Sequence, residues 1–238
     1  MNYNALLEYI NQTPLTWLVV TLLSYKLGII IYEKFNKHTL LQPIITSYII
    51  ILSLIVYTNT SFEEYFKSVE IIHFFLGPAT VALALPLYNN LKHLKALFIP
   101  ILATLFIAGV FSIILAVGLL WVLGAELPTI LSMTTKSITA PIAVITSEQI
   151  GAIPSLAVGF VIITGMIGAI FGTSIFKLMN VKRETSQGFA LGLVSHGIGT
   201  ARAIEIGEKA AAFSALAMGL SGILTAVFLP LIIQMINP

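Results

Sequence analysis

The sequence predicts an all-α, polytopic membrane protein, and three observations support this prediction. Of its 238 residues, 58% are hydrophobic and only 9% are charged, whereas a soluble domain has about 25% charged residues. The apolar residues form blocks of about 20, the helical length that crosses roughly 30 Å of hydrocarbon. Blocks such as 97–120 lack the apolar–polar alternation of a membrane β-barrel. We expect about 7–8 transmembrane segments, some interrupted or re-entrant, in a single integral membrane domain over residues 1–238.

The composition also excludes several classes of function. The chain has no cysteine, so neither a disulfide framework nor a thiolate site can form. The net charge of +2 is scattered and includes no basic cluster, so no nucleic-acid partner is expected. Neither a P-loop, nor a GxSxG elbow, nor an HExxH motif is present. We therefore expect no enzyme, no catalytic residue, no cofactor and no metal.

The first two blocks, 14–32 and 41–57, are expected to be simple spans. The link between them carries Lys34 and Lys37, and the acidic link 58–70 follows the second span. Basic links lie on the cytoplasmic side of a membrane. The N-terminus is therefore expected outside.

Block 71–88 is apolar but interrupted. Gly77 and Pro78 lie near its middle and Pro86 near its end, and proline removes a backbone donor and clashes with the preceding turn. A broken helix is expected. Gly77, Pro78 and Thr80 are candidates for one wall of a binding site, with a plain packing kink as the alternative.

Two later blocks, 96–123 and 154–178, are expected to be spans with small residues at helical spacing. These residues are Ala108, Ser112, Ala116, Gly168 and Gly172. Small residues let helices approach closely in lipid, so they serve either internal packing or a homo-oligomer. A last span is expected at 210–236.

Block 127–153 is the least apolar, and we expect it to turn back to the side from which it enters. If it crossed, the basic residues of 177–183 would lie outside, against the positive-inside rule. Non-helical backbone at membrane depth needs protein or water around it, so a re-entrant segment indicates a cavity. With 188–207 counted as a crossing, the C-terminus is expected inside.

A weak internal repeat is indicated by residues 80–85 (TVALAL) and 139–144 (TAPIAV). Each is followed by a polar link and a span that contains glycine. Transporters are often built from repeats whose interrupted helices meet at the substrate site. The match is short, and apolar six-residue segments also resemble one another by chance.

The stretch 195–205 (SHGIGTARAIE) places polar residues and glycines inside an apolar block. Gly197 and Gly199 let the backbone leave helical geometry, and Thr200 is a candidate N-cap for a restarted helix. The first turn of that helix would offer free amides and a positive dipole end to an anion.

Intramembrane polar residues are rare and costly, and they indicate function by default. Arg202 has the geometry to bind a carboxylate, Ser195 offers a hydroxyl, and His196 or Glu205 could carry a coupled proton. The alternative is structural. Arg202 and Glu205, three residues apart, would then form an ion pair, and His196 would bind a backbone carbonyl.

Lys136 is isolated among hydroxyl groups in the block expected to be re-entrant. Ser137 and Thr139 follow it, and Pro141 limits helix continuity there. The alternative is a lysine that reaches to the interface from the tip of the segment. Two interrupted segments, each with a lasting positive charge and hydroxyl groups, indicate an anionic solute.

These residues also carry a family resemblance. Three motifs, at 75–88 (FLGPATVALALPLY), 136–143 (KSITAPIA) and 195–203 (SHGIGTARA), are similar to those of the LrgB family. The resemblance covers about residues 10 to 236. The family includes the bacterial CidB and YohK proteins and the carboxyl half of the plastid glycolate/glycerate transporter.

The resemblance implies a multi-pass protein of the bacterial cytoplasmic (inner) membrane and two functions. One is secondary transport of small monocarboxylates such as glycolate, glycerate or pyruvate. The other is an antiholin-like role with a small LrgA/CidA-type membrane partner, which modulates murein hydrolase activity and autolysis. The residues favour transport, because an antiholin needs only helices that pack, not a buried lysine and arginine near broken backbone.

Overall fold

The computed structural model describes residues 14–35 and 41–236. All regular structure in these residues is helical, which confirms the predicted fold class. Their contacts divide the chain into two compact units, Met1–Ala82 and Leu83–Pro238, and each is described by itself. The expectation of a single domain stays a prediction. Lys37, which belongs to the expected basic link between the first two spans, lies outside the described residues.

Unit 1 is built on two packed apolar helices, α2 (Pro14–Lys34) and α3 (Pro43–Thr58). Gly28 permits their close approach, since a methyl group there would lie 2.8 Å from the Pro43 carbonyl oxygen. Trp17 on α2 is 4% exposed and packs edge-to-face on Tyr65, with ring centroids 5.6 Å apart. Trp17 is therefore buried inside the unit, although most of the other described aromatic side chains of unit 1 are exposed.

The predicted acidic link contains a short helix, and the predicted broken helix is confirmed. Helix α4 (Phe62–Ser68) begins with a capping box in which Ser61 and Glu64 each accept a hydrogen bond from the other's backbone amide. Beyond it the chain runs as short pieces. They are α5 (Glu70–Phe74) and α6 (Leu76–Ala82) in unit 1, then α7 (Ala84–Asn89) and α8 (Leu91–Ala96) in unit 2.

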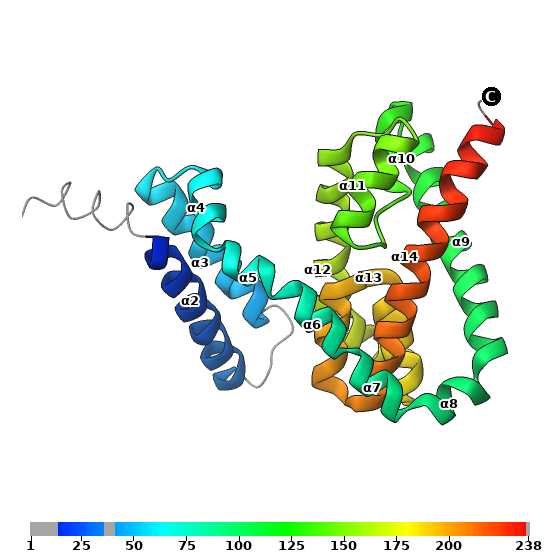
Figure 1. Ribbon diagram of the computed structural model, residues 1–238, viewed down its shortest axis with the longest axis horizontal. Helices are drawn as coiled ribbons and strands as arrows, with labels where there is room; N and C mark the ends of the chain where they lie inside the picture. Colours follow the sequence, from blue (N-terminus) through cyan, green and yellow to red (C-terminus); the bar gives the residue numbers. More distant parts are fainter. Residues whose placement is uncertain (1–13, 36–40, 237–238) are drawn as a thin grey trace, which may run out of the picture. The chain divides into compact units, whose positions relative to one another are not determined.

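Unit 2 contains three long apolar helices, α9 (Phe98–Val122), α12 (Pro154–Leu178) and α14 (Glu208–Ile236). These and α2 are the described helices that are long and apolar enough to cross a membrane alone, and α3 is shorter. Within unit 2, α9 and α14 run upward and α12 runs downward (Figure 1). Their exposed side chains are mostly large and apolar, as expected of helices that face lipid.

Between α9 and α12, block 127–153 forms a helical hairpin, as the charge pattern predicted. Helices α10 (Leu127–Met133) and α11 (Ala140–Gln149) have seven and ten residues, about 10 and 15 Å, which is too short to cross. Ser132 bonds both to the backbone N–H of Ile153, at 2.9 Å, and to its carbonyl, at 3.3 Å. The block therefore returns to the end from which it starts.

Helix α13 (Glu184–Ile206) is a second hairpin, and here the expected crossing at 188–207 is wrong. Its backbone leaves helical geometry at His196, where φ is 41° and ψ is −130°. A straight helix of this length would be about 33 Å long. Instead, a methyl group at Gly207 would lie 3.0 Å from a carboxyl oxygen of Glu184. We call 184–195 the ingoing limb and 197–206 the outgoing limb.

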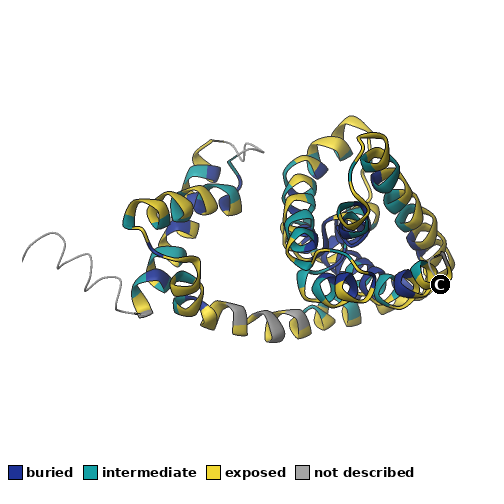
Figure 2. Ribbon diagram, turned by 90° about the horizontal axis from the view of Figure 1, so that it is seen from above, coloured by how far each residue is buried: buried dark blue, intermediate teal, exposed yellow. Residues whose placement is uncertain are grey.

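The two hairpins enter unit 2 from opposite ends. In Figure 1, α10 and α11 lie beside the upper half of α12 and α13 lies beside the lower half. Helix α9 with the first hairpin and α12 with the second thus form two copies of one motif, inverted relative to each other. Figure 2 shows that the buried residues of unit 2 gather where these elements pack together.

The predicted repeat of 80–85 and 139–144 does not coincide with these two motifs. Residues 139–144 begin α11, at the turn of the first hairpin. Residues 80–85 are divided between α6 and α7, and so between the two units.

Candidate functional site

The turns of the two hairpins both pack against Val161 of α12. His196, at the turn of the second hairpin, hydrogen-bonds through Nε2 to the carbonyl oxygen of Val161 at 2.9 Å. Val161 also packs with Ile138, at the turn of the first hairpin. One residue of α12 therefore contacts both turns. We call this region, residues 136–141 and 195–199, the hairpin junction.

Helix α14 brings the same two elements together on its own side. The Thr200 hydroxyl lies 2.9 Å from Ser214 Oγ and 3.7 Å from Met218 Sδ. A methyl group at Gly222 would lie 3.0 Å from the side chain of Ile142 on α11. Met218 and Gly222 are one turn apart, about 6 Å along the helix. The starts of α11 and of the outgoing limb thus lie on successive turns of α14.

Two helix N-termini therefore open at the hairpin junction. First-turn amides have no acceptor within their own helix, and the helix dipole adds positive potential. Thr139 is the N-cap of α11, and its hydroxyl makes no capping hydrogen bond. Pro141 in the first turn of α11 and Gly197 at the start of the outgoing limb are both exposed. Such an arrangement suits a small anion.

Lys136 supplies a full positive charge at the hairpin junction. It is 8% exposed, and its Nζ donates to Ser112 Oγ at 2.8 Å and to Ser137 Oγ at 3.0 Å. Among the described residues no carboxylate pairs with this ammonium. Its ammonium is therefore buried without a counterion among those residues, and this burial favours the site interpretation over a lysine that reaches to the interface.

His196 has the structural contact that the alternative interpretation expected. A carbonyl oxygen only accepts, so Nε2 carries the hydrogen in this bond. A methyl group at Gly165 would lie 2.7 Å from Nε2, so the imidazole fills a groove that this glycine leaves on α12. The bond and the groove hold a backbone conformation that costs a non-glycine residue about 1–3 kcal/mol.

Ser195 and Thr200 face neighbouring helices. Ser195 is fully buried against Gly168, and its hydroxyl finds no hydrogen-bond partner among the described residues. The expected N-cap role of Thr200 is wrong, because the break lies at His196 and Thr200 is inside the outgoing limb. Its hydroxyl donates to the His196 carbonyl at 2.9 Å and binds Ser214. It therefore fastens the restarted helix to α14.

Arg202 follows the hairpin junction by three residues, and its described partners lie outside that region. It forms an ion pair with Glu205, which confirms the structural alternative, and donates to Thr173 Oγ1 at 3.5 Å. Thr173 follows Val161 by twelve residues on α12, which is about 18 Å along the helix. That Arg202 and Lys136 share one site stays a prediction, and the partners of Arg202 on α12 and α13 do not support it.

The remaining expected site residues divide between the two units. Gly199 lies in the hairpin junction, packed on the Leu191 carbonyl. Gly77, Pro78 and Thr80 lie on α6 in unit 1, and their role as a wall stays a prediction.

Two residues of the site were not assigned to it from the sequence. Ser112 binds Lys136 and Val161 contacts both turns. In the sequence, Ser112 is only one of the small residues at helical spacing in block 96–123. Val161 carries no signal, because an apolar residue in an apolar span is unremarkable.

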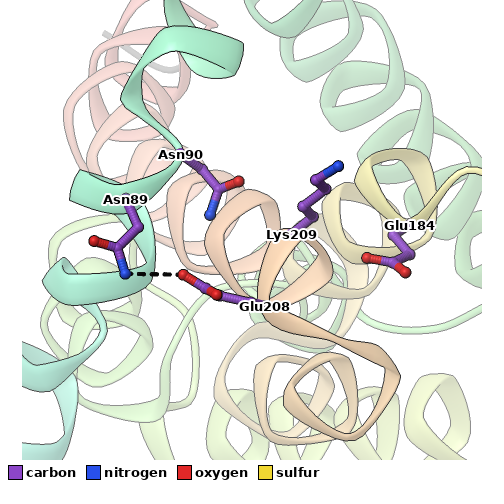
Figure 3. A pocket seen from close by; sticks show the side chains of 5 residues that line it. All are labelled: Asn89, Asn90, Glu184, Glu208 and Lys209. Carbon is purple, nitrogen blue, oxygen red and sulfur yellow. Dashed lines mark hydrogen bonds between the residues drawn. The ribbon is translucent and has the colours of Figure 1, made fainter.

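A polar pocket of about 640 Å³ lies elsewhere in unit 2 (Figure 3). It opens where α13 and α14 begin, and Asn89 on α7 donates to Glu208 there at 2.9 Å. Its lining residues are Asn89, Asn90, Glu184, Glu208 and Lys209. It contains no residue of the hairpin junction, and its charge balance is acidic, so the anion site is not here.

Comparison with known proteins supports the family that the sequence motifs resemble. The model of the LrgB-like family matches residues 21–235. The chain belongs to the LrgB-like family. Relatives named "Antiholin-like protein LrgB" from Bacillus cereus (strains B4264 and AH187) and Bacillus anthracis (strain A0248) are each 31% identical over 226 residues. The alignments cover 95% of this chain and 98% of each relative. No solved structure matches the chain.

Proposed function

We propose that this LrgB-like protein is a secondary transporter of small monocarboxylates, of the glycolate, glycerate or pyruvate type, in the bacterial cytoplasmic membrane. The observation that supports the proposal is the hairpin junction, where the turns of two hairpins from opposite ends pack against Val161 and the first turn carries a buried lysine without a carboxylate partner among the described residues. Transporters bind substrate where interrupted helices of inverted repeats meet near mid-membrane. A merely structural bundle has no need of such a charge.

The charges of the hairpin junction favour a monoanion. Arg202 is neutralised by Glu205, whereas Lys136 has only hydroxyl partners. One carboxylate would therefore balance the charge of Lys136. The amides at the starts of α11 and of the outgoing limb would bind its oxygens. Ser137 and Thr139 would take a hydroxyl or keto oxygen beside it.

The orientation that we propose differs from the sequence-based expectation at the C-terminus. Because α13 returns to the end from which it starts, α14 leaves from the side of the basic link at 177–183. The positive-inside rule assigns that link to the cytoplasm. The C-terminus would then lie outside, as the N-terminus is expected to do.

Uptake into proteoliposomes tests the transport proposal. Lys136→Met should lower uptake of glycolate or pyruvate by about tenfold or more, since a hydrogen bond to a charged group is worth about 1.5–3 kcal/mol. Lys182→Met, at an exposed lysine, should keep wild-type uptake. Arg202→Gln should keep uptake within about threefold, because a partly exposed ion pair contributes little. Full uptake by Lys136→Met would refute the proposal.

A second candidate is the antiholin-like role, and the names of the relatives support this function rather than transport. It predicts that expression or deletion alters host-cell lysis and murein hydrolase release, and that a small LrgA-type membrane protein co-purifies with the chain. Lys136→Met separates the two functions. If that variant loses uptake and keeps its effect on lysis, the antiholin-like role does not depend on transport. If it loses both, one activity underlies the two.

A further inference from the structure

Gly197 is a glycine that the fold does not require. Gly199 packs on the Leu191 carbonyl, and Gly188 and Gly192 pack on the backbone of α14, so a side chain at any of these positions would clash. A methyl group at Gly197 would meet no atom within 4 Å. Its φ is also not positive. Neither packing nor backbone conformation therefore explains a glycine at this position.

The absence of a side chain at Gly197 leaves open space beside the hairpin junction. It is the first residue of the outgoing limb and is exposed, whereas His196 beside it is buried. The outgoing limb runs antiparallel to α14, with Thr200 beside Ser214 and Met218. Gly197 therefore lies almost a turn closer to the start of α11 than Thr200 does.

A groove of about 370 Å³ begins at the same level, between α11 and α14. Ile142 and Gly222, which touch where α11 starts, line its end nearest the hairpin junction, and the rest of its lining is mostly apolar. An acid whose carboxylate is bound at the two helix N-termini would have this apolar groove beside its carbon chain.

We infer that Gly197 sets the size of the acid that the site accepts. This inference rests on the proposed transport function and adds to it the residue that limits the length of the acid, whose carbon chain would pass over Gly197. The carboxylate and the oxygen on the second carbon stay at Lys136 and the amides. Only the carbons beyond them need the space that a side chain at position 197 would fill.

Direct titration of the purified full chain with glycolate, pyruvate and 2-oxopentanoate tests this inference. The wild type should bind all three acids. Gly197→Ala should keep its affinity for glycolate within about threefold of wild type. Its affinity for 2-oxopentanoate should fall by about tenfold or more, since one methylene group changes discrimination in a fitted pocket by about 10- to 200-fold. Gly197→Val should lose affinity for all three.

Two controls separate size selection from misfolding. Gly118→Ala on α9 also adds a methyl group in open space, and it should leave every affinity unchanged. A methyl group at Gly197 meets no atom and its φ is not positive, so Gly197→Ala should unfold at about the wild-type temperature.

The outcomes distinguish the inference from the function on which it rests. If the wild type binds the acids and Gly197→Ala binds them in the same ratio, Gly197 does not select size and the transport proposal stands. If the wild type binds none of the three, the proposed function fails and this inference fails with it.

Discussion

At the scale of single residues, Lys136 shows what a buried charge can and cannot indicate from sequence. Its isolation among hydroxyl residues identified it as a candidate, and the structure buries it at the hairpin junction. Its partner Ser112 comes from another helix, 24 residues earlier in the chain. A contact between distant helices leaves no local pattern, so only the structure could reveal it.

We predict that Ser112 stabilises the fold only through Lys136. Ser112→Ala removes one of two hydroxyl partners of a buried ammonium, which should lower the free energy of unfolding by about 1.5–3 kcal/mol. In a Lys136→Met background the same change should cost far less, because no charge is left unsatisfied. Unfolding in detergent of the two single variants and the double variant measures this coupling. Equal costs of Ser112→Ala in both backgrounds would mean that the Lys136–Ser112 bond contributes nothing.

At the scale of elements, the second hairpin escaped prediction because of how α13 breaks. Gly197 and Gly199 were expected to carry the break, yet His196 adopts the positive φ and both glycines stay helical. The useful signal was the close spacing of Gly188, Gly192 and Gly199. These three glycines let the ingoing limb pack on α14 and the outgoing limb pack back on the ingoing one. A run of glycines at such spacing predicts close packing, but not that the chain turns back.

We predict that Gly192→Ala destabilises the protein. The added methyl group would overlap the Ser214 carbonyl, a backbone atom that cannot rotate away, so the ingoing limb must shift from α14. Overpacking of this kind costs roughly 1–3 kcal/mol. Thermal unfolding in detergent should show the loss, and Gly118→Ala, which meets no neighbour, is the matched control. An unchanged unfolding temperature for Gly192→Ala would show that these helices are not in such close contact.

At the scale of the whole molecule, the composition predicts the fold class, and the distribution of basic residues predicts one of the two hairpins. Block 127–153 had to turn back, because otherwise the basic residues after α12 would lie outside. The same argument could not detect the hairpin of α13. No basic link follows α13, so nothing in the charge pattern conflicts with a crossing there. The inverted repeat was also hidden, because helices in lipid need only apolar residues and the two copies therefore share little sequence.

The second hairpin reverses the side of the C-terminus, and this can be measured. The chain has no cysteine, so single cysteines can be introduced without further change. Gln234→Cys, near the end of α14, and Lys182→Cys, in the basic link after α12, are both at exposed positions. A membrane-impermeant maleimide should label Gln234→Cys on intact cells and label Lys182→Cys only after lysis, because the basic link is retained in the cytoplasm and α14 crosses once from there. Labelling of both cysteines only after lysis would instead make α13 a crossing helix, and the inverted repeat would not exist in the membrane.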